Sequence, residues 1–140
     1  MKTTLALAAA LLASAQTAGG PAPAIGHWDK VEWKVSASLP SAAAGHEYHL
    51  LFEDPTTHGV QTLVRFAKGY ALPPHTHSVA ETIVVLDGKL LVELGGKKET
   101  LSRGSYAVIP ANTPHSLTAT KRVEMIVSFS GPVDFKGLPK

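Results

Sequence analysis

The most constraining feature of this chain is a set of three histidines and one glutamate at β-strand spacing. His75 and His77 are two residues apart, Glu81 follows four residues later, and His115 lies further along the chain. Side chains alternate between the two faces of a strand, so His75 and His77 project from one face, and Glu81 has the same parity. Three imidazoles and one carboxylate are suitable ligands for a divalent transition metal.

The residues around this set predict how the two parts of the site meet. Asp87-Gly88 is a strong hairpin signal, and the segment 89–94 reads as the returning strand. His115 must then come from a later strand that passes beside the first. A site built from two separate strands requires a sheet that curls back on itself.

At these residues the sequence resembles the cupin superfamily. The first motif of that family is a glycine, five residues, His-x-His, three or four residues, Glu, six residues and a second glycine. Its fixed positions are filled here by Gly69, His75, His77, Glu81 and Gly88.

The second motif of the family is a glycine, five residues, Pro-x-Gly, two residues, His, three residues and Asn. Gly104, Pro110 and His115 fit this motif, whereas Asn112 replaces its glycine and Ala119 replaces its Asn. Asn tolerates the left-handed backbone conformation that a tight turn can need, so the first departure is mild. The second departure removes a polar contact expected near the metal.

The resemblance implies an all-β fold, a single-domain cupin jelly-roll β-barrel. Outside the motifs, short strands at even spacing favour a barrel or a sandwich as well. The strands are predicted at 28–35, 46–52, 60–67, 75–77, 80–86, 89–94, 98–101, 105–109, 115–119 and 123–129. Segment 36–45 reads as a long loop, which leaves open whether it caps the barrel mouth as a lid.

The predicted metal ligands are His75, His77, Glu81 and His115, and they hold one divalent transition metal: Fe, Mn, Ni, Cu or Zn. The resemblance implies O2-dependent cleavage of a chelating substrate, or lyase or isomerase chemistry on small acids. The favoured hypothesis is a metal-dependent oxygenase acting on a small oxygenated organic molecule, with Glu81 as a catalytic base. The alternative is an exported cupin that binds a metal or a small ligand without turnover.

The substrate pocket is predicted from the same alternation of side chains. Ile83 and Val85 share the face of Glu81, and Leu117 shares the face of His115, so these three are expected to line the pocket. The other histidines, at positions 27, 46, 49 and 58, lack a comparable pattern and are interpreted as solvated or capping residues.

The N-terminus has the pattern of a secretory signal peptide. Lys2 supplies the positive charge, an apolar run of Leu and Ala follows, and Ala13-Ser14-Ala15 is a cleavage site. The expected organisation is a signal peptide at 1–15, a flexible lead at 16–26 and the barrel domain at 27–140. The mature protein is expected to be periplasmic or secreted, with no contact with the membrane after cleavage.

Composition limits the partners. The chain has 13 Lys and Arg against 11 Asp and Glu, a formal net charge of +2, which gives no basis for nucleic-acid binding. It has no cysteine, so disulfides and thiolate metal sites are excluded. A small-molecule ligand or substrate is the expected partner. Val84 and Leu86 are apolar at outward-facing positions, which favours a homodimer.

Overall fold

The computed structural model describes residues 22–35 and 45–138, and over these residues the protein is almost entirely β-structure. The elements, in chain order, are a 3-10 helix Trp28–Lys30 and the strands β1 (Lys34–Val35), β2 (His46–Glu53), β3 (Val60–Phe66), β4 (Ala71–Thr76), β5 (Glu81–Asp87), β6 (Leu90–Leu94), β7 (Lys97–Leu101), β8 (Tyr106–Ile109), β9 (His115–Ala119), β10 (Val123–Phe129) and β11 (Lys136–Gly137).

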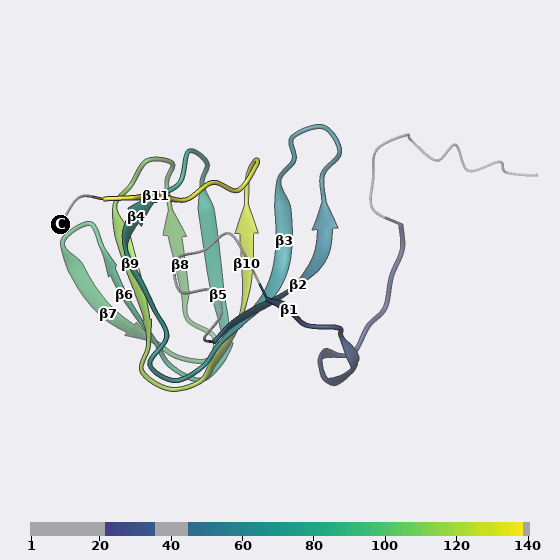
Figure 1. Cartoon of the computed structure of the whole chain (residues 1–140), viewed down its shortest axis with the longest axis horizontal. Coiled ribbons are helices and arrows are strands. Elements are labelled where there is room, and N and C mark those ends of the chain that lie inside the picture. The colour runs from purple at the N-terminus through teal and green to yellow at the C-terminus, as the bar shows by residue number, and fades with distance from the viewer. Residues whose placement is uncertain (1–21, 36–44, 139–140) are drawn as a thin grey trace, which may run out of the picture.

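The described strands form two antiparallel sheets (Figure 1). One sheet has the order β1-β2-β3-β10-β5-β8 and the other has the order β11-β4-β9-β6-β7. Strands distant in sequence are neighbours in both sheets, because β10 lies between β3 and β5 and β9 lies between β4 and β6. This is a jelly-roll arrangement, in which the chain passes repeatedly between the sheets. The predicted all-β fold class is confirmed.

The hydrophobic core lies between the two sheets, and strand alternation produces it. In β5 the burial pattern alternates strictly, so Ile83 and Val85 are fully buried while Val84 is only partly buried. Met125 and Val127 of the neighbouring strand β10 belong to the same core, as does Leu90 of β6 in the other sheet. The core therefore uses every second residue of the central strands, as the sequence pattern predicts.

The hairpin predicted at Asp87-Gly88 is wrong, although a tight turn does form there. Strand β5 pairs with β10 and β8, whereas β6 pairs with β7 and β9, so the turn carries the chain from one sheet to the other. Gly88 has φ +88°, and a Cβ placed there would lie 1.9 Å from the carbonyl oxygen of Arg122. Only glycine fits both the backbone conformation and the close approach of the chain before β10.

The first predicted strand, 28–35, is mostly wrong. It contains the 3-10 helix and only the two-residue strand β1. The rings of Trp28 and Trp33 pack edge to face with centroids 5.0 Å apart, and the guanidinium of Arg65 lies 4.2 Å over the Trp33 ring. The Trp28–Trp33 pair and the cation–π contact with Arg65 of β3 thus organise this segment in place of a continuous ladder.

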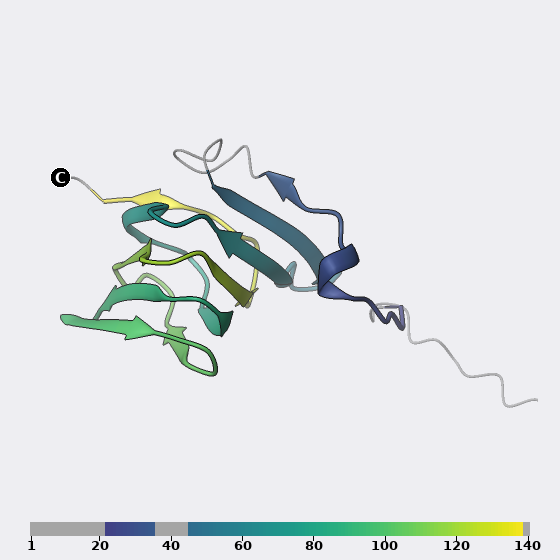
Figure 2. The ribbon, with the colours of Figure 1, turned by 90° about the horizontal axis from the view of Figure 1, so that it is seen from below.

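The C-terminal strand β11 is absent from the prediction, which ends the last strand at residue 129. Lys136 and Gly137 pair with Thr76 and His75 of β4, and the N–H of Leu138 donates to the carbonyl of Pro74. Figure 2 shows this yellow segment lying along the edge of its sheet beside β4.

Several predictions concern residues outside the described ranges. The signal peptide at 1–15, most of the lead at 16–26 and nearly all of the loop at 36–45 lie there. Among the described residues, 22–35 and 45–138, no helix has the length and apolar character to cross a bilayer.

Candidate metal centre

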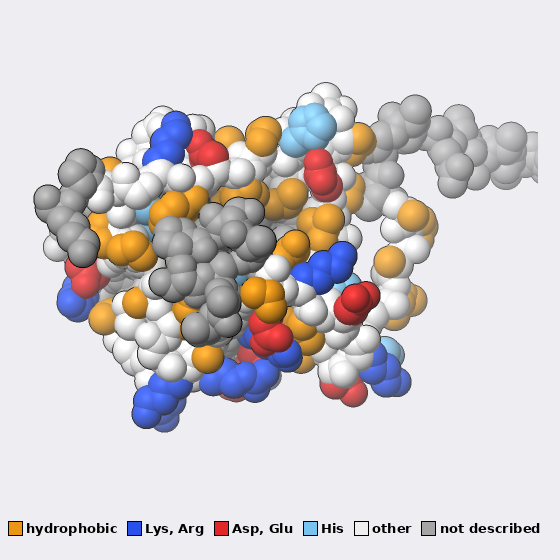
Figure 3. Space-filling model, in the orientation of Figure 1, with side chains coloured by type: hydrophobic (Ala, Val, Ile, Leu, Met, Phe, Trp, Pro, Cys, Tyr) orange, Lys and Arg blue, Asp and Glu red, His pale blue; other side chains and the backbone are white. Residues whose placement is uncertain are grey.

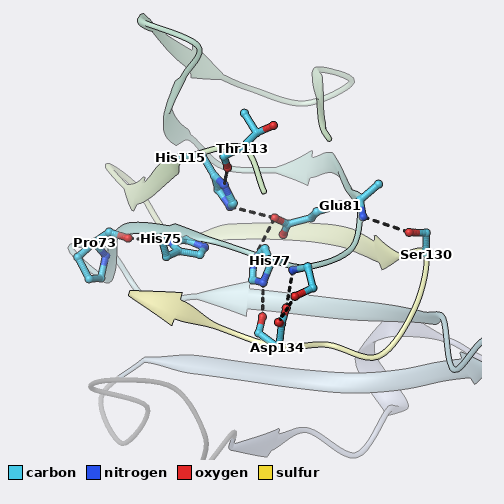
Figure 4. Close-up of polar contacts among 10 residues, drawn as sticks. Pro73, His75, His77, Glu81, Thr113, His115, Ser130 and Asp134 are labelled. Atoms are coloured by element: carbon cyan, nitrogen blue, oxygen red, sulfur yellow. Dashed lines mark hydrogen bonds and ion pairs between the residues drawn. The ribbon is translucent and has the colours of Figure 1, made fainter. Parts of the chain in front are cut away.

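The four predicted ligands lie together at one end of the barrel (Figure 4). His75 is in β4, His77 directly follows it, Glu81 begins β5 and His115 begins β9. Strands β4 and β9 are antiparallel neighbours, and His75 pairs with His115 across them. The two motifs therefore meet on adjacent strands of the five-stranded sheet, and Glu81 comes from β5 of the other sheet. The predicted single sheet that curls back on itself is replaced here by two sheets that face each other.

The loops that carry the ligands share one end of the molecule. The connections β4–β5, β8–β9 and β10–β11 all lie at the top of the view in Figure 1. All four ligand side chains are buried, with His75 at 0 % exposure and Glu81 at 4 %. A buried charged group is costly unless it is paired or binds a metal, so this cluster needs a partner.

Backbone carbonyls fix the orientation of each imidazole. Nδ1 of His75 lies 2.7 Å from the carbonyl oxygen of Pro73, and Nδ1 of His115 lies 2.9 Å from that of Thr113. Nδ1 of His77 bonds to the carbonyl oxygen of Asp134. A carbonyl oxygen only accepts, so each neutral ring carries its hydrogen on Nδ1 and has a lone pair on Nε2.

The ligand nitrogens of His75, His77 and His115 lie within 4.8 Å of one another. Nε2 of His75, Nε2 of His115 and Oε2 of Glu81 are buried and have no hydrogen-bond partner within 22–35 and 45–138. Oε2 of Glu81 approaches Nε2 of His115 to 3.1 Å and Nε2 of His77 to 3.5 Å. Two imidazole nitrogens and a carboxylate oxygen that are buried without hydrogen-bond partners among the described residues, with the His77 ring beside them, fit a divalent metal.

The electrostatics of the site favour a neutral imidazole beside an ionised carboxylate. Burial lowers the pKa of His75 to about 4. Burial alone would raise the pKa of Glu81, but its contacts with His115 and His77 outweigh burial and lower that pKa. For His77 the effect of burial is outweighed by Glu81 and the Asp134 carbonyl, so its pKa is raised.

A C-terminal segment, 133–138, supports the site, and the sequence analysis missed it. Phe135 stacks on His75 with ring centroids 4.4 Å apart. The Asp134 carboxylate accepts hydrogen bonds from the backbone N–H and the hydroxyl of Ser78, at 2.7 and 2.6 Å. Ser78 directly follows His77, so these bonds hold the Asp134 carbonyl against the His77 ring. The available signal was the polar Asp134 and the aromatic Phe135 after the Gly131-Pro132 stop.

The departure from the second motif at Asn112 is structurally accommodated. Asn112 has φ +58°, the left-handed conformation that the family glycine would adopt easily. Its backbone N–H donates to the carbonyl of His77 at 2.7 Å, so this turn ties the second motif to the first.

The second departure, Ala119, lies away from the site. Ala119 is fully buried in the core and exchanges backbone hydrogen bonds with Gly69 and Tyr70. It is four residues from His115, about 13 Å along a strand. The expectation that this position borders the metal is therefore wrong for this chain.

A cavity of about 400 Å³ opens beside the ligands. Leu117 lines this cavity, as predicted, but Ile83 and Val85 do not; both are packed in the core instead. The cavity extends toward the inner faces of β2 and β3, so the pocket wall comes from strands that the same-face argument did not consider. Its lining residues are His46, Tyr48, Leu50, Val60, Thr62, Val64, Phe66, Leu72, His75, His77, Glu81, Leu117, Met125, Val127, Phe129, Val133, Asp134 and Phe135.

His46 corrects the interpretation of the remaining histidines. It is buried, at 8 % exposure, and lines the cavity rather than being solvated. The other three are at least partly exposed, and Nδ1 of His49 bonds to the carbonyl of Glu32. His58 lies in a turn and bonds to the Glu53 carboxylate at 3.0 Å.

The fold and site can now be compared with known proteins. The sequence matches the family model "Cupin domain" over residues 62–129, which contains both histidine motifs and all four clustered side chains. The structure also superimposes on a RmlC-like cupin from Shewanella frigidimarina NCIMB 400. The TM-score is 0.64 at 17 % identity, over 78 % of this chain and 91 % of that one. Residues 62–129 of this chain are a cupin domain.

Other similarities concern smaller parts of the cupin. It is 44 % identical over 69 residues to quercetin 2,3-dioxygenase of Bacillus subtilis (strain 168), which is 49 % of this chain and 20 % of that protein. The cupin thus spans about a fifth of that relative's length. A variant of salicylate 1,2-dioxygenase from Pseudoaminobacter salicylatoxidans superimposes with a TM-score of 0.56 at 20 % identity, over 66 % of this chain and 30 % of that one.

Proposed function

We propose that this cupin is a metal-dependent oxygenase that acts on a small oxygenated organic molecule. One observation carries the proposal: three imidazoles are oriented by backbone carbonyls so that their Nε2 lone pairs converge beside an ionised carboxylate. The proposed metal ligands are His75, His77, Glu81 and His115.

The similarity to a quercetin dioxygenase supports the choice of reaction class. Cupins host several chemistries, so lyase or isomerase activity on a small acid is the related option that the fold leaves open. The apolar cavity next to the ligands supports a small-molecule substrate, because ligand pockets commonly measure about 300–1,000 Å³.

Each part of the site has a role in this proposal. A divalent metal held by His75, His77, Glu81 and His115 would supply Lewis-acid and redox chemistry to the substrate. Glu81, whose pKa is lowered, is ionised near neutral pH and accepts a proton from an acidic hydroxyl group of the substrate onto a carboxylate oxygen. Burial of the cluster and the aromatic ring of Phe135 exclude water from the reacting groups.

Oxygen uptake by the metal-loaded protein tests the reaction class. The panel comprises diketones, catechols, flavonols and thiols, and uptake is expected with at least one of them. His77→Ala is expected to abolish the uptake, whereas His49→Ala, a change on the outward face of β2, is expected to leave it intact. Silence across the panel would contradict the oxygenase assignment.

The alternative function is a metal- or ligand-binding cupin without turnover. The cavity contains no ionisable carboxylate other than Glu81 and Asp134 among its described lining residues, which favours simple binding. Saturable ligand binding to the metal-loaded protein, without oxygen uptake or any product, is the result expected of this binder.

We also propose that the protein is exported, that it does not bind nucleic acid and that it forms a homodimer. The signal-peptide pattern supports a periplasmic or secreted protein with no membrane contact after cleavage. On the face drawn in Figure 3, Lys and Arg side chains lie beside Asp and Glu, which argues against a nucleic-acid partner. A homodimer is proposed from the exposed apolar side chains Tyr106 and Val108 of β8.

A further inference from the structure

His46 is a buried histidine surrounded by aromatic rings. Its ring packs against Phe66, Tyr70 and Tyr48, with centroid distances of 5.2, 5.9 and 6.3 Å. Its Nδ1 is buried and has no partner among the described residues. Burial lowers the pKa of His46 to about 4, so the ring is neutral near pH 7. An unpaired buried nitrogen is costly, and in native proteins it requires an explanation.

The same imidazole lines the cavity that also contains the metal centre. His46, the first residue of β2, pairs with Phe66 at one end of β3. Val60, at the other end of β3, pairs with Phe129 of β10, and Phe129 pairs in turn with Glu81 of β5. Six residues along β3 correspond to about 20 Å. His46 therefore lies at the end of the cavity opposite the metal centre.

The second sheet gives a similar separation. The His46 ring packs on Tyr70, whose backbone bonds to Ala119 of β9. Ala119 is four residues from His115, or about 13 Å along the strand. A ligand that contacts both ends of the cavity must therefore be elongated.

The walls between the two ends are apolar. Leu72 and Leu117 come from one sheet, and Val64, Met125 and Val127 come from the other. Aromatic rings border both ends, Phe66 at the His46 end and Phe135 at the metal end. Flat aromatic groups match such walls, because they bury a large area and lose little rotamer freedom.

We propose that His46 is a ligand-binding residue at the far end of the cavity, and that the cavity takes an elongated aromatic molecule with a phenolic hydroxyl group at its distal ring. That the other end of this ligand chelates the metal is an assumption that rests on the proposed function. The distal hydroxyl group hydrogen-bonds to the neutral imidazole, which offers one donor and one acceptor. His46 is then a specificity-determining residue, and the bond is formed only when the right ligand is present.

Binding of two matched flavonols tests this inference. The probes are the unsubstituted flavonol and the flavonol with one para hydroxyl group on its pendant phenyl ring. They are titrated into the Zn(II)-loaded full-length protein without oxygen, so that the ligand is not consumed. The hydroxylated probe is expected to bind roughly tenfold more tightly to the native protein, the value of one hydrogen bond to a buried group.

The variant His46→Phe is expected to remove this preference, so that the two flavonols bind to it with equal affinity. Phenylalanine is compatible with the surrounding rings, and zinc content per chain reports whether the site is intact. His49→Phe, on the outward face of the same strand, is the matched control and is expected to retain the preference. A para-methoxy flavonol, which cannot donate a hydrogen bond, provides a second measurement that needs no variant, and it is expected to bind more weakly than the hydroxylated probe.

Three results would overturn the inference: equal affinity of the native protein for the two flavonols, an unchanged preference in His46→Phe, or failure of both flavonols to bind the zinc-loaded protein. Each of these leaves the metal centre standing if zinc is bound and oxygen uptake occurs with smaller chelating substrates. If the native protein did not bind zinc, the proposed function would be contradicted as well.

Discussion

Two residues of this cupin have an unusual backbone conformation or protonation state that their surroundings explain. Asn112 has a left-handed backbone at the turn before His115, and His46 is neutral within a cluster of aromatic rings. Both residues lie outside the set of proposed metal ligands, so the effect of changing each on the free energy of unfolding can be measured separately from catalysis.

The turn at Asn112 is expected to discriminate between alanine and glycine. Asn112→Ala places a Cβ in the left-handed region without the local hydrogen bonding of Asn, and is expected to lower the free energy of unfolding by about 1 kcal/mol. Asn112→Gly is expected to be tolerated, because glycine adopts this conformation readily. Urea unfolding of the two variants measures the difference, and equal stability would contradict the strain at this turn.

Burial of His46 is expected to make stability depend on pH. Its pKa is lowered from 6.5 to about 4 in the folded protein, so below pH 6.5 the unfolded chain binds a proton that the folded chain does not. Stability is therefore expected to fall as the pH falls from 6.5 toward 4, by up to about 3 kcal/mol from this residue. His46→Phe is expected to flatten the profile over this interval. Parallel profiles for the two proteins would show that His46 is not buried in the neutral form.

At the scale of elements, the structure shows which parts of the site the sequence could predict. The clustering of His75, His77 and His115 and the turn at Asp87-Gly88 follow from alternation and turn chemistry, which are local or nearly local rules. That this turn joins two different sheets, and does not close a hairpin, does not follow from those rules. The role of β2, β3 and the segment 133–138 does not follow, because it depends on which strands close the barrel. No local pattern near Phe135 specifies that its ring will stack on His75.

The link between the C-terminal segment and His77 is expected to tune metal affinity. Ser78→Ala removes a hydrogen bond that holds Asp134, whose carbonyl orients the His77 ring. Loss of such an outer contact to a ligand histidine is expected to weaken metal binding about tenfold. Chelator competition measures the metal dissociation constant.

A matched set of variants controls this measurement. Ser78→Thr retains the hydroxyl group and is expected to restore most of the affinity. Glu53→Gln removes an exposed contact with His58 in the β2–β3 hairpin and is expected to leave metal affinity unchanged. If Ser78→Ala binds metal as tightly as the native protein, the segment does not position His77.

At the scale of the whole molecule, the outer face of the six-stranded sheet suggests how two copies associate. Val84 pairs with Tyr106 on one side and with Ile126 on the other, which places three apolar side chains in a row across the sheet. Tyr106 is 69 % exposed, and β8 is the edge strand of this sheet. Exposed apolar surface of this kind commonly marks an interface.

The native protein is therefore expected to sediment as a dimer. Val84→Lys introduces a charge in the middle of the row and is expected to shift the protein to monomers while zinc content per chain stays unchanged. Analytical ultracentrifugation over a range of concentrations measures both states. A native protein that remains monomeric at every concentration would contradict the dimer proposal.

The metal centre is the central claim about the molecule, and elemental analysis of the purified protein tests it most directly. The account predicts close to one Fe, Mn, Ni, Cu or Zn ion per chain, lost in His77→Ala and retained in His49→Ala. No metal, or the same trace of zinc in the native protein and in His77→Ala, would contradict it.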